Sequence, residues 1–136
     1  KDTPDLAAAY LGAMKIGAVP LAMNVRAAPK DIAFMLRDSR AKVLLVDAEF
    51  LPGFESIEHE LEHPPKVFVA NGKSTARQPI EAIIAGRSDH LDAEPMSPDD
   101  MALWVYTSGT QFQAVLGGAI VALYEVSILA IRIVTR

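Results

Sequence analysis

The chain has 136 residues, a formal charge of −4, 51% apolar and 22% charged residues, and no cysteine. This length suits one domain and excludes a two-domain enzyme for this chain. The apolar fraction is high enough for a buried core, which argues against intrinsic disorder. The cysteine count excludes disulfides, a thiol nucleophile and cysteine-ligated zinc. The mildly acidic balance argues against binding to nucleic acid. The sequence shows no signal-peptide pattern, so we expect a cytoplasmic protein. It begins at Lys1 rather than at an initiator Met, so we also expect a piece of a longer protein.

The N-terminal residues predict a helix followed by a short strand. Thr3 is a suitable N-cap, Pro4 fits the first turn, and Gly17 is a suitable stop. Residues 18–22 are short and apolar, which predicts a strand. Pro20 has no N–H for a sheet ladder, so we expect this strand at an edge or at a bulge.

A second helix and a buried strand follow. Pro29 and Asp31 suit the first turn of a helix. Residues 42–47 form a nearly continuous apolar run, which is typical of strands covered on both faces of a parallel sheet. The inward face of the helix is predicted to carry Ile32, Met35, Leu36 and Ser39.

The alternation of helices and strands continues towards the C-terminus. We predict a helix over residues 53–62, a strand over 67–69, a short helix over 79–85 and an exposed connection over 87–100. Repeated helices and strands with short connections indicate βαβ units. The predicted fold is therefore α/β, with part of a doubly wound, mostly parallel sheet flanked by helices.

After the connection, a strand predicted over residues 101–106 leads into Thr107, Ser108, Gly109 and Thr110. Such a run suits phosphate binding, because glycine lets the backbone approach closely and the hydroxyl and N–H groups donate to phosphate oxygens. An ordinary turn is the alternative on spacing alone.

The run Tyr-Thr-Ser-Gly-Thr at 106–110 resembles the start of the phosphate-binding loop of the adenylate-forming superfamily, which includes acyl- and aryl-CoA ligases. Residues 10–21 are similar to a helix-to-strand passage near the N-terminus of these enzymes. The tryptophan at position 104 makes this part of the sequence most similar to the benzoate-type CoA ligases. The resemblance covers about residues 2–110, through motifs in register at Asn24, 31–39, 41–47 and 97–100.

This resemblance implies the N-terminal part of an ATP-dependent carboxylic acid–CoA ligase. Such enzymes join a small carboxylic acid to ATP as an acyl-adenylate, and coenzyme A then displaces AMP; Mg²⁺ assists. The matched motif implies that Thr107, Ser108, Gly109 and Thr110 contact the nucleotide phosphates. It assigns no catalytic residue and no metal ligand within this chain.

The sequence then departs from the family pattern. The loop of the family continues with Thr-Gly, a variable residue and Pro-Lys-Gly, whereas residues 111–118 read Gln-Phe-Gln-Ala-Val-Leu-Gly-Gly. We therefore divide the chain into a partial adenylation subdomain, 1–110, and an apolar tail, 111–136. We expect a truncated or frame-altered product or a cloning boundary, and a chain that is inactive by itself.

The tail is almost wholly apolar from Ala114 to Ile131, which is just long enough to span a bilayer. Glu125 within the run argues against a membrane helix, so the preferred interpretation is a buried helix or strand pair, or else unnatural sequence that happens to be apolar. A segment of this kind without its partners favours self-association.

Two other functions remain as alternatives. One is a binding or interaction module without catalysis. The other is a zinc hydrolase, because His59-Glu60-Leu61-Glu62-His63 matches the His-Glu-x-x-His pattern, and Glu81 would then be the third ligand. The zinc interpretation is disfavoured, because Pro64 and Pro65 stop a helix directly after His63.

Overall fold

The computed structural model describes residues 3–106 and 126–132. Its helices are α1 (Pro4–Lys15), α2 (Pro29–Ser39), α3 (Leu51–Glu55), a 3₁₀ turn η1 (Glu58–Glu60) and α4 (Ile80–Ile84). Its strands are β1 (Val19–Asn24), β2 (Val43–Asp47), β3 (Lys66–Ala70), β4 (Gln78–Pro79) and β5 (Val126–Arg132).

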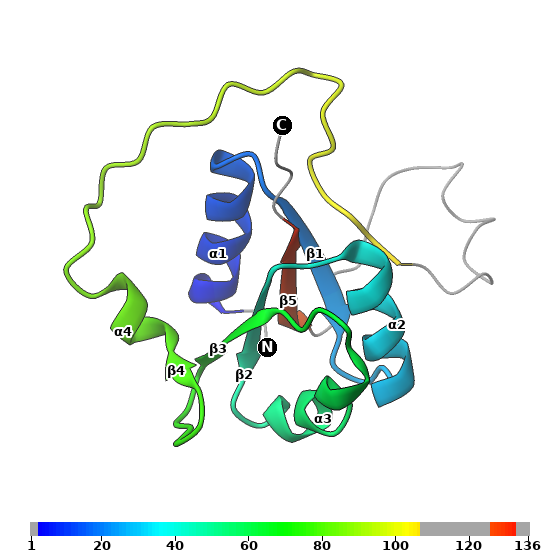
Figure 1. Cartoon of the computed structure of the whole chain (residues 1–136). Helices are drawn as coiled ribbons and strands as arrows, with labels where there is room; N and C mark the ends of the chain where they lie inside the picture. Colours follow the sequence, from blue (N-terminus) through cyan, green and yellow to red (C-terminus); the bar gives the residue numbers. More distant parts are fainter. Residues whose placement is uncertain (1–2, 107–125, 133–136) are drawn as a thin grey trace.

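The strands form one sheet in the order β1-β5-β2-β3-β4 (Figure 1). β2, β3 and β4 pair in parallel, whereas β5 pairs antiparallel with both β1 and β2. Four of the five strands thus run in one direction, which confirms the predicted α/β fold with a mostly parallel sheet. β1 lies at the edge of the sheet order, as the proline at position 20 predicted. Its pairing with β5 shifts register between Met23 and Asn24, where Ser127 of β5 is left without a partner.

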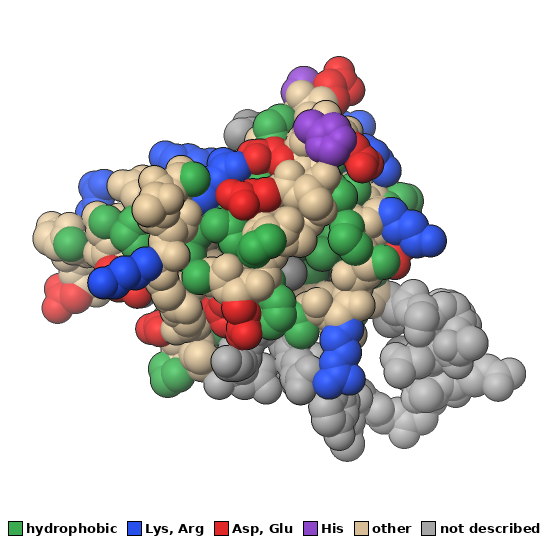
Figure 2. All heavy atoms as spheres, turned by 90° about the horizontal axis from the view of Figure 1, so that it is seen from below, with side chains coloured by type: hydrophobic (Ala, Val, Ile, Leu, Met, Phe, Trp, Pro, Cys, Tyr) green, Lys and Arg blue, Asp and Glu red, His purple; other side chains and the backbone are tan. Residues whose placement is uncertain are grey.

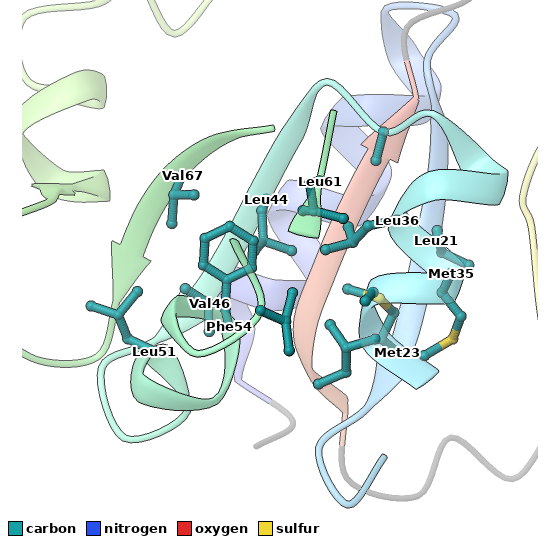
Figure 3. Close-up of a cluster of buried hydrophobic side chains, with 14 of the residues drawn as sticks. Leu21, Met23, Met35, Leu36, Leu44, Val46, Leu51, Phe54, Leu61 and Val67 are labelled. Atoms are coloured by element: carbon teal, nitrogen blue, oxygen red, sulfur yellow. The ribbon is translucent and has the colours of Figure 1, made fainter. Parts of the chain in front are cut away.

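Helices cover both faces of the sheet (Figure 1). α1 lies over Leu45 and Asp47, whereas α2 and α3 pack on the opposite face. Alternate strand residues point towards α2 and α3, as expected for a pleated strand. In this core Met35, Leu36 and Phe54 pack with the strand residues Leu21, Met23, Leu44, Val46 and Val67 (Figure 3). Ile32 of α2 and Val69 of β3 belong to the same core.

The ends of α1 follow from its sequence. The Thr3 hydroxyl accepts a hydrogen bond of 3.3 Å from the N–H of Leu6, which caps the first turn. Gly17 has a positive φ of 69°, a conformation that suits glycine just after a helix. Both predictions for this helix are therefore confirmed.

The predicted helix over residues 53–62 is wrong in extent. The structure has one short helix, α3, followed by η1, with an extended backbone at Leu61. The Ser56 hydroxyl donates to the Gly53 carbonyl at 2.8 Å, a local bond that competes with a continuing helix. Glycine at position 53 also lowers helix propensity. Elsewhere the predicted elements up to residue 85 agree with the structure to within about two residues at each end.

Candidate functional site

The segment before the predicted phosphate-binding residues lies along β1. The N–H of Trp104 donates to the Pro20 carbonyl at 3.0 Å, and Trp104 forms a parallel bridge with Leu21. This segment therefore runs in the same direction as β1. Its end lies towards the carboxyl ends of the parallel strands, which is where ligands bind in open α/β sheets.

The predicted strand over residues 101–106 is wrong, since only the bridge at Trp104 forms. Pro20 gives a physical reason. Its carbonyl faces the segment, so its nitrogen faces the same way, but it has no N–H to donate. The ladder therefore cannot continue from Trp104 back towards residue 102.

Three aromatic side chains hold this segment against α2. The rings of Trp104 and Tyr106 stack at 6.0 Å between centroids, and Tyr106 meets Phe34 edge-on at 6.1 Å. Trp104 and Tyr106 also pack against the main hydrophobic core. The residues between them, Leu103 and Val105, are exposed, so the segment alternates like a strand despite its single bridge.

The Tyr106 hydroxyl ties the same segment to α2 by a hydrogen bond. It donates to Oδ2 of Asp38 at 2.5 Å. Burial raises the pKa of Tyr106, and the hydrogen bond to the Asp38 carboxylate and the negative charge of that group raise it further. Tyr106 therefore keeps its proton and acts as a neutral donor at physiological pH.

The predicted site residues Thr107, Ser108, Gly109 and Thr110 lie outside the described residues. Their assignment therefore stays a prediction. The structure describes the residue directly before them, Tyr106, which is bonded to α2 through Asp38, two residues after Trp104 is bonded to β1.

A second polar feature lies at the carboxyl ends of β2 and β3, on the α1 face of the sheet. The side-chain amide of Asn71 donates to Oδ1 of the buried Asp47 at 2.8 Å. The pair borders a small hollow beneath the first turns of α1, lined there by Thr3, Asp5 and Leu6. This pair was not predicted from the sequence, although polar residues at the carboxyl ends of two buried strands were a usable signal.

The His-Glu-x-x-His motif does not lie on one helix. Residues 58–60 form η1, Leu61 is extended, and the side chains of Glu62 and His63 are 90% and 84% exposed. Histidine side chains lie at the surface beside acidic ones in Figure 2. Within residues 3–106 and 126–132, no three acidic or histidine side chains form a cluster that could hold a metal ion. The helical arrangement required by the zinc interpretation is therefore absent from the structure.

The apolar tail enters the described structure only at β5. Residues 126–132 form one strand, and Ala114 to Glu125 lie outside the described residues, so the predicted strand pair stays a prediction. In the part of the chain that the structure describes, no helix is long and apolar enough to cross a membrane.

Comparison with known proteins finds one family model and several curated relatives that match most of this chain. The family model for AMP-binding enzymes matches residues 1–111. The chain is 45% identical over 109 residues to a 3-hydroxybenzoate–CoA ligase of Aromatoleum sp. (strain CIB), covering 80% of this chain and 21% of that protein. It is 44% identical over 115 residues to a 3-hydroxybenzoate–CoA/4-hydroxybenzoate–CoA ligase of Thauera aromatica, with the same coverage.

A solved structure agrees with these relatives. The anthranilate CoA ligase AuaEII in complex with anthranoyl-AMP matches with a TM-score of 0.76 and 30% identity, over 80% of this chain and 21% of that one. The chain thus spans about a fifth of the length of the proteins it matches. The two relatives and the solved structure named above are CoA ligases. The match over residues 1–111 shows that the chain belongs to the AMP-binding enzyme family.

Proposed function

We propose that residues 1–110 form the N-terminal part of an ATP-dependent aryl-CoA ligase, in which Thr107, Ser108, Gly109 and Thr110 begin the phosphate-binding loop. One observation carries this proposal: the segment ending at Tyr106 runs parallel to β1 and is held by Pro20 and Asp38. Tyr106, the last described residue before the run, therefore lies towards the carboxyl edge of the sheet, where backbone N–H groups commonly bind phosphate in α/β proteins.

The chemistry follows from the family. A carboxylate oxygen of the acid attacks the α-phosphate of ATP, pyrophosphate leaves, and an acyl-adenylate forms. The thiol of coenzyme A then attacks the acyl carbon, and AMP leaves as the thioester forms. Negative charge shifts to pyrophosphate in the first step, so donors placed at the phosphates stabilise the transition state electrostatically. The loop N–H and hydroxyl groups would supply such donors, and Mg²⁺ would supply positive charge at the triphosphate.

The acid is proposed to be a benzoate carrying a small substituent. The two relatives described above are named for hydroxybenzoates, and the matched structure holds anthranoyl-AMP. The cytoplasm, where ATP and coenzyme A are available, is the proposed location. Because this chain spans a fifth of its relatives, these assignments concern the complete ligase.

We propose that the 136-residue chain by itself does not complete the reaction. Residues 111–118 carry no lysine or arginine, so the basic residue that the family places in its loop is missing. The purified chain should give no ATP–pyrophosphate exchange with 3-hydroxybenzoate. A measurable rate would contradict the proposal.

A chimera tests the assignment of the loop itself. Residues 2–110 of this chain would replace the matching fifth of the Aromatoleum ligase, leaving the rest of that enzyme unchanged. We expect exchange activity that depends on 3-hydroxybenzoate. Gly109→Val should abolish it, because a branched side chain blocks the close approach of phosphate, whereas the control Gly12→Ala should retain it. A chimera that folds and is equally active with Gly109→Val would refute the loop assignment.

Nucleotide binding separates this proposal from a non-catalytic binding module. The melting temperature of the isolated chain should not change with MgATP, because the isolated chain lacks the remaining four fifths of its relatives. A saturable rise in the melting temperature without any exchange activity would instead favour the binding module.

A further inference from the structure

β1 and β2 leave a slot between them that is one strand wide, and β5 fills it. β1 and β2 follow one another in the chain through α2, and they run in the same direction, yet they are not neighbours in the sheet. β5 lies between them. It pairs with β1 from Val19 to Asn24 and with β2 from Val43 to Val46, antiparallel on both sides.

The slot between β1 and β2 needs a strand to satisfy the backbone hydrogen-bonding groups on its two sides. Without β5, β1 and β2 would each present a row of unpaired N–H and C=O groups facing the other, which is a template for an added strand. Apolar core residues Leu21, Met23, Leu44 and Val46 border the slot, and all are fully buried. An extended apolar segment running antiparallel to both strands is therefore the ligand that the slot fits.

The strand that fills the slot is joined to the rest of the fold through a long stretch of chain. The described chain before it ends at Tyr106, twenty residues before Val126. Twenty residues can reach up to about 66 Å when extended. A domain of this size has a radius of gyration of only about 14 Å. Chain length therefore permits β5 to reach a slot in a neighbouring copy as well as its own.

We propose that two copies of this chain exchange β5, so that residues 126–132 of each copy occupy the slot between β1 and β2 of the other. The exchanged pair keeps every strand contact of the single chain, so exchange costs mainly the entropy of association. It is favoured when the chains fold at high concentration, because the strand from a second copy then competes with the tethered one. This inference concerns the apolar tail and does not depend on any activity towards ATP.

Introduced cysteines can detect the exchange, because the chain has none of its own. Ala22 and Leu129 lie directly opposite each other in the β1–β5 register. One preparation carries Ala22→Cys and a second carries Leu129→Cys. The two are unfolded, mixed, refolded together and oxidised. Only a strand passed between copies holds the two cysteines at disulfide distance.

We expect a disulfide-linked dimer of the two variants on a non-reducing gel. While the dimer is the minor species, its share should rise about tenfold for a tenfold higher protein concentration during refolding. Ser88→Cys, in the exposed connection, replaces Ala22→Cys in the matched control mixture and should give only a faint band. The double variant in one chain, diluted before refolding, should close an internal disulfide.

Each alternative result contradicts the proposal. If the double variant closes internally but the mixture gives no more dimer than the Ser88→Cys control, β5 stays in its own chain. If neither the mixture nor the double variant forms the disulfide, β5 does not occupy the slot in this register, and exchange through it is excluded.

Discussion

The hydroxyl of Tyr106 donates a 2.5 Å hydrogen bond to the carboxylate of Asp38, a residue 68 positions earlier in the chain. This bond joins α2 to the last described residue before the predicted phosphate-binding run. Phe34, one turn before Asp38 on the same helix, packs edge-on against the Tyr106 ring. Helix α2 thus holds Tyr106 both by its hydroxyl, through Asp38, and by its ring, through Phe34.

Replacing Tyr106 with phenylalanine should lower stability by about 1 kcal/mol, because it removes this hydrogen bond and keeps the ring packing. Urea unfolding followed by circular dichroism measures the change. Tyr10→Phe is the matched control, since no hydrogen bond of its hydroxyl is found among the described residues; its effect should be smaller. Equal effects of the two variants would show that the bond to Asp38 adds nothing.

The same tyrosine should make stability fall at alkaline pH. Its pKa is raised above the ordinary value of 10.0 by burial and by Asp38, so the folded state holds the proton more tightly than the unfolded chain. The resulting stability is complete below about pH 10 and is lost as the pH rises through the raised pKa. The difference in unfolding free energy between wild type and Tyr106→Phe should therefore shrink above pH 10. Tyr10, whose pKa burial also raises, is present in both proteins and cancels.

In the active chimera, Tyr106→Phe should weaken ATP use rather than binding of the acid. A loss of about 1 kcal/mol in positioning the loop corresponds to about a fivefold lower kcat/KM for ATP. The KM for 3-hydroxybenzoate should stay unchanged. ATP–pyrophosphate exchange at varied ATP and varied acid separates the two effects. If Tyr106→Phe impaired the use of ATP and the binding of 3-hydroxybenzoate equally, the result would point to a general loss of structure.

Short-range signals made much of the fold predictable. The Thr3 cap, the prolines that begin α1 and α2 and the inward face of α2 all act within a few residues, and the structure has each of them. Pro20 located β1 at the sheet edge for a purely local reason, its missing N–H. The hydroxyl and glycine run at 107–110 was likewise visible, but a resemblance to a family was needed to distinguish it from a turn.

Long-range relationships were not predictable from local pattern. The apolar run that contains β5 has the same composition whether it forms a helix, an edge strand or a central strand. Only its pairing with β1 and β2 decides the outcome. The bond from Tyr106 to Asp38 and the pair of Asp47 with Asn71 depend on which elements become neighbours, and hydrophobic periodicity does not encode that.

A proline within β5 should be damaging or harmless according to its register. Ala130 lies opposite Leu21 in β1 and Leu44 in β2, so Ala130→Pro removes a donor from the centre of the sheet and should cost about 3 kcal/mol or more. Ser127 falls at the bulge, opposite no residue of either strand, and Ser127→Pro should cost much less. Thermal melting of both variants measures this contrast. Equal melting temperatures would show that β5 is not paired on both sides.

Gly72 should tolerate no side chain, whereas Gly12 should accept one. Gly72 has a φ of 152°, and a Cβ built there would lie 2.5 Å from the Cβ of Ala48, a short side chain that cannot turn away. Gly72→Ala therefore combines backbone strain with a clash and should cost about 2–4 kcal/mol.

Gly12 lies inside α1, and a Cβ there would meet no atom within 4 Å among the described residues. Gly12→Ala should therefore raise stability by about 1 kcal/mol through helix propensity alone. Urea midpoints shifted in opposite directions for the two variants are the expected result. Because Gly72 directly follows the asparagine that binds Asp47, Gly72→Ala should also speed amide exchange at the carboxyl ends of β2 and β3. A Gly72→Ala protein with unchanged midpoint and exchange would show that this turn does not have the backbone conformation described.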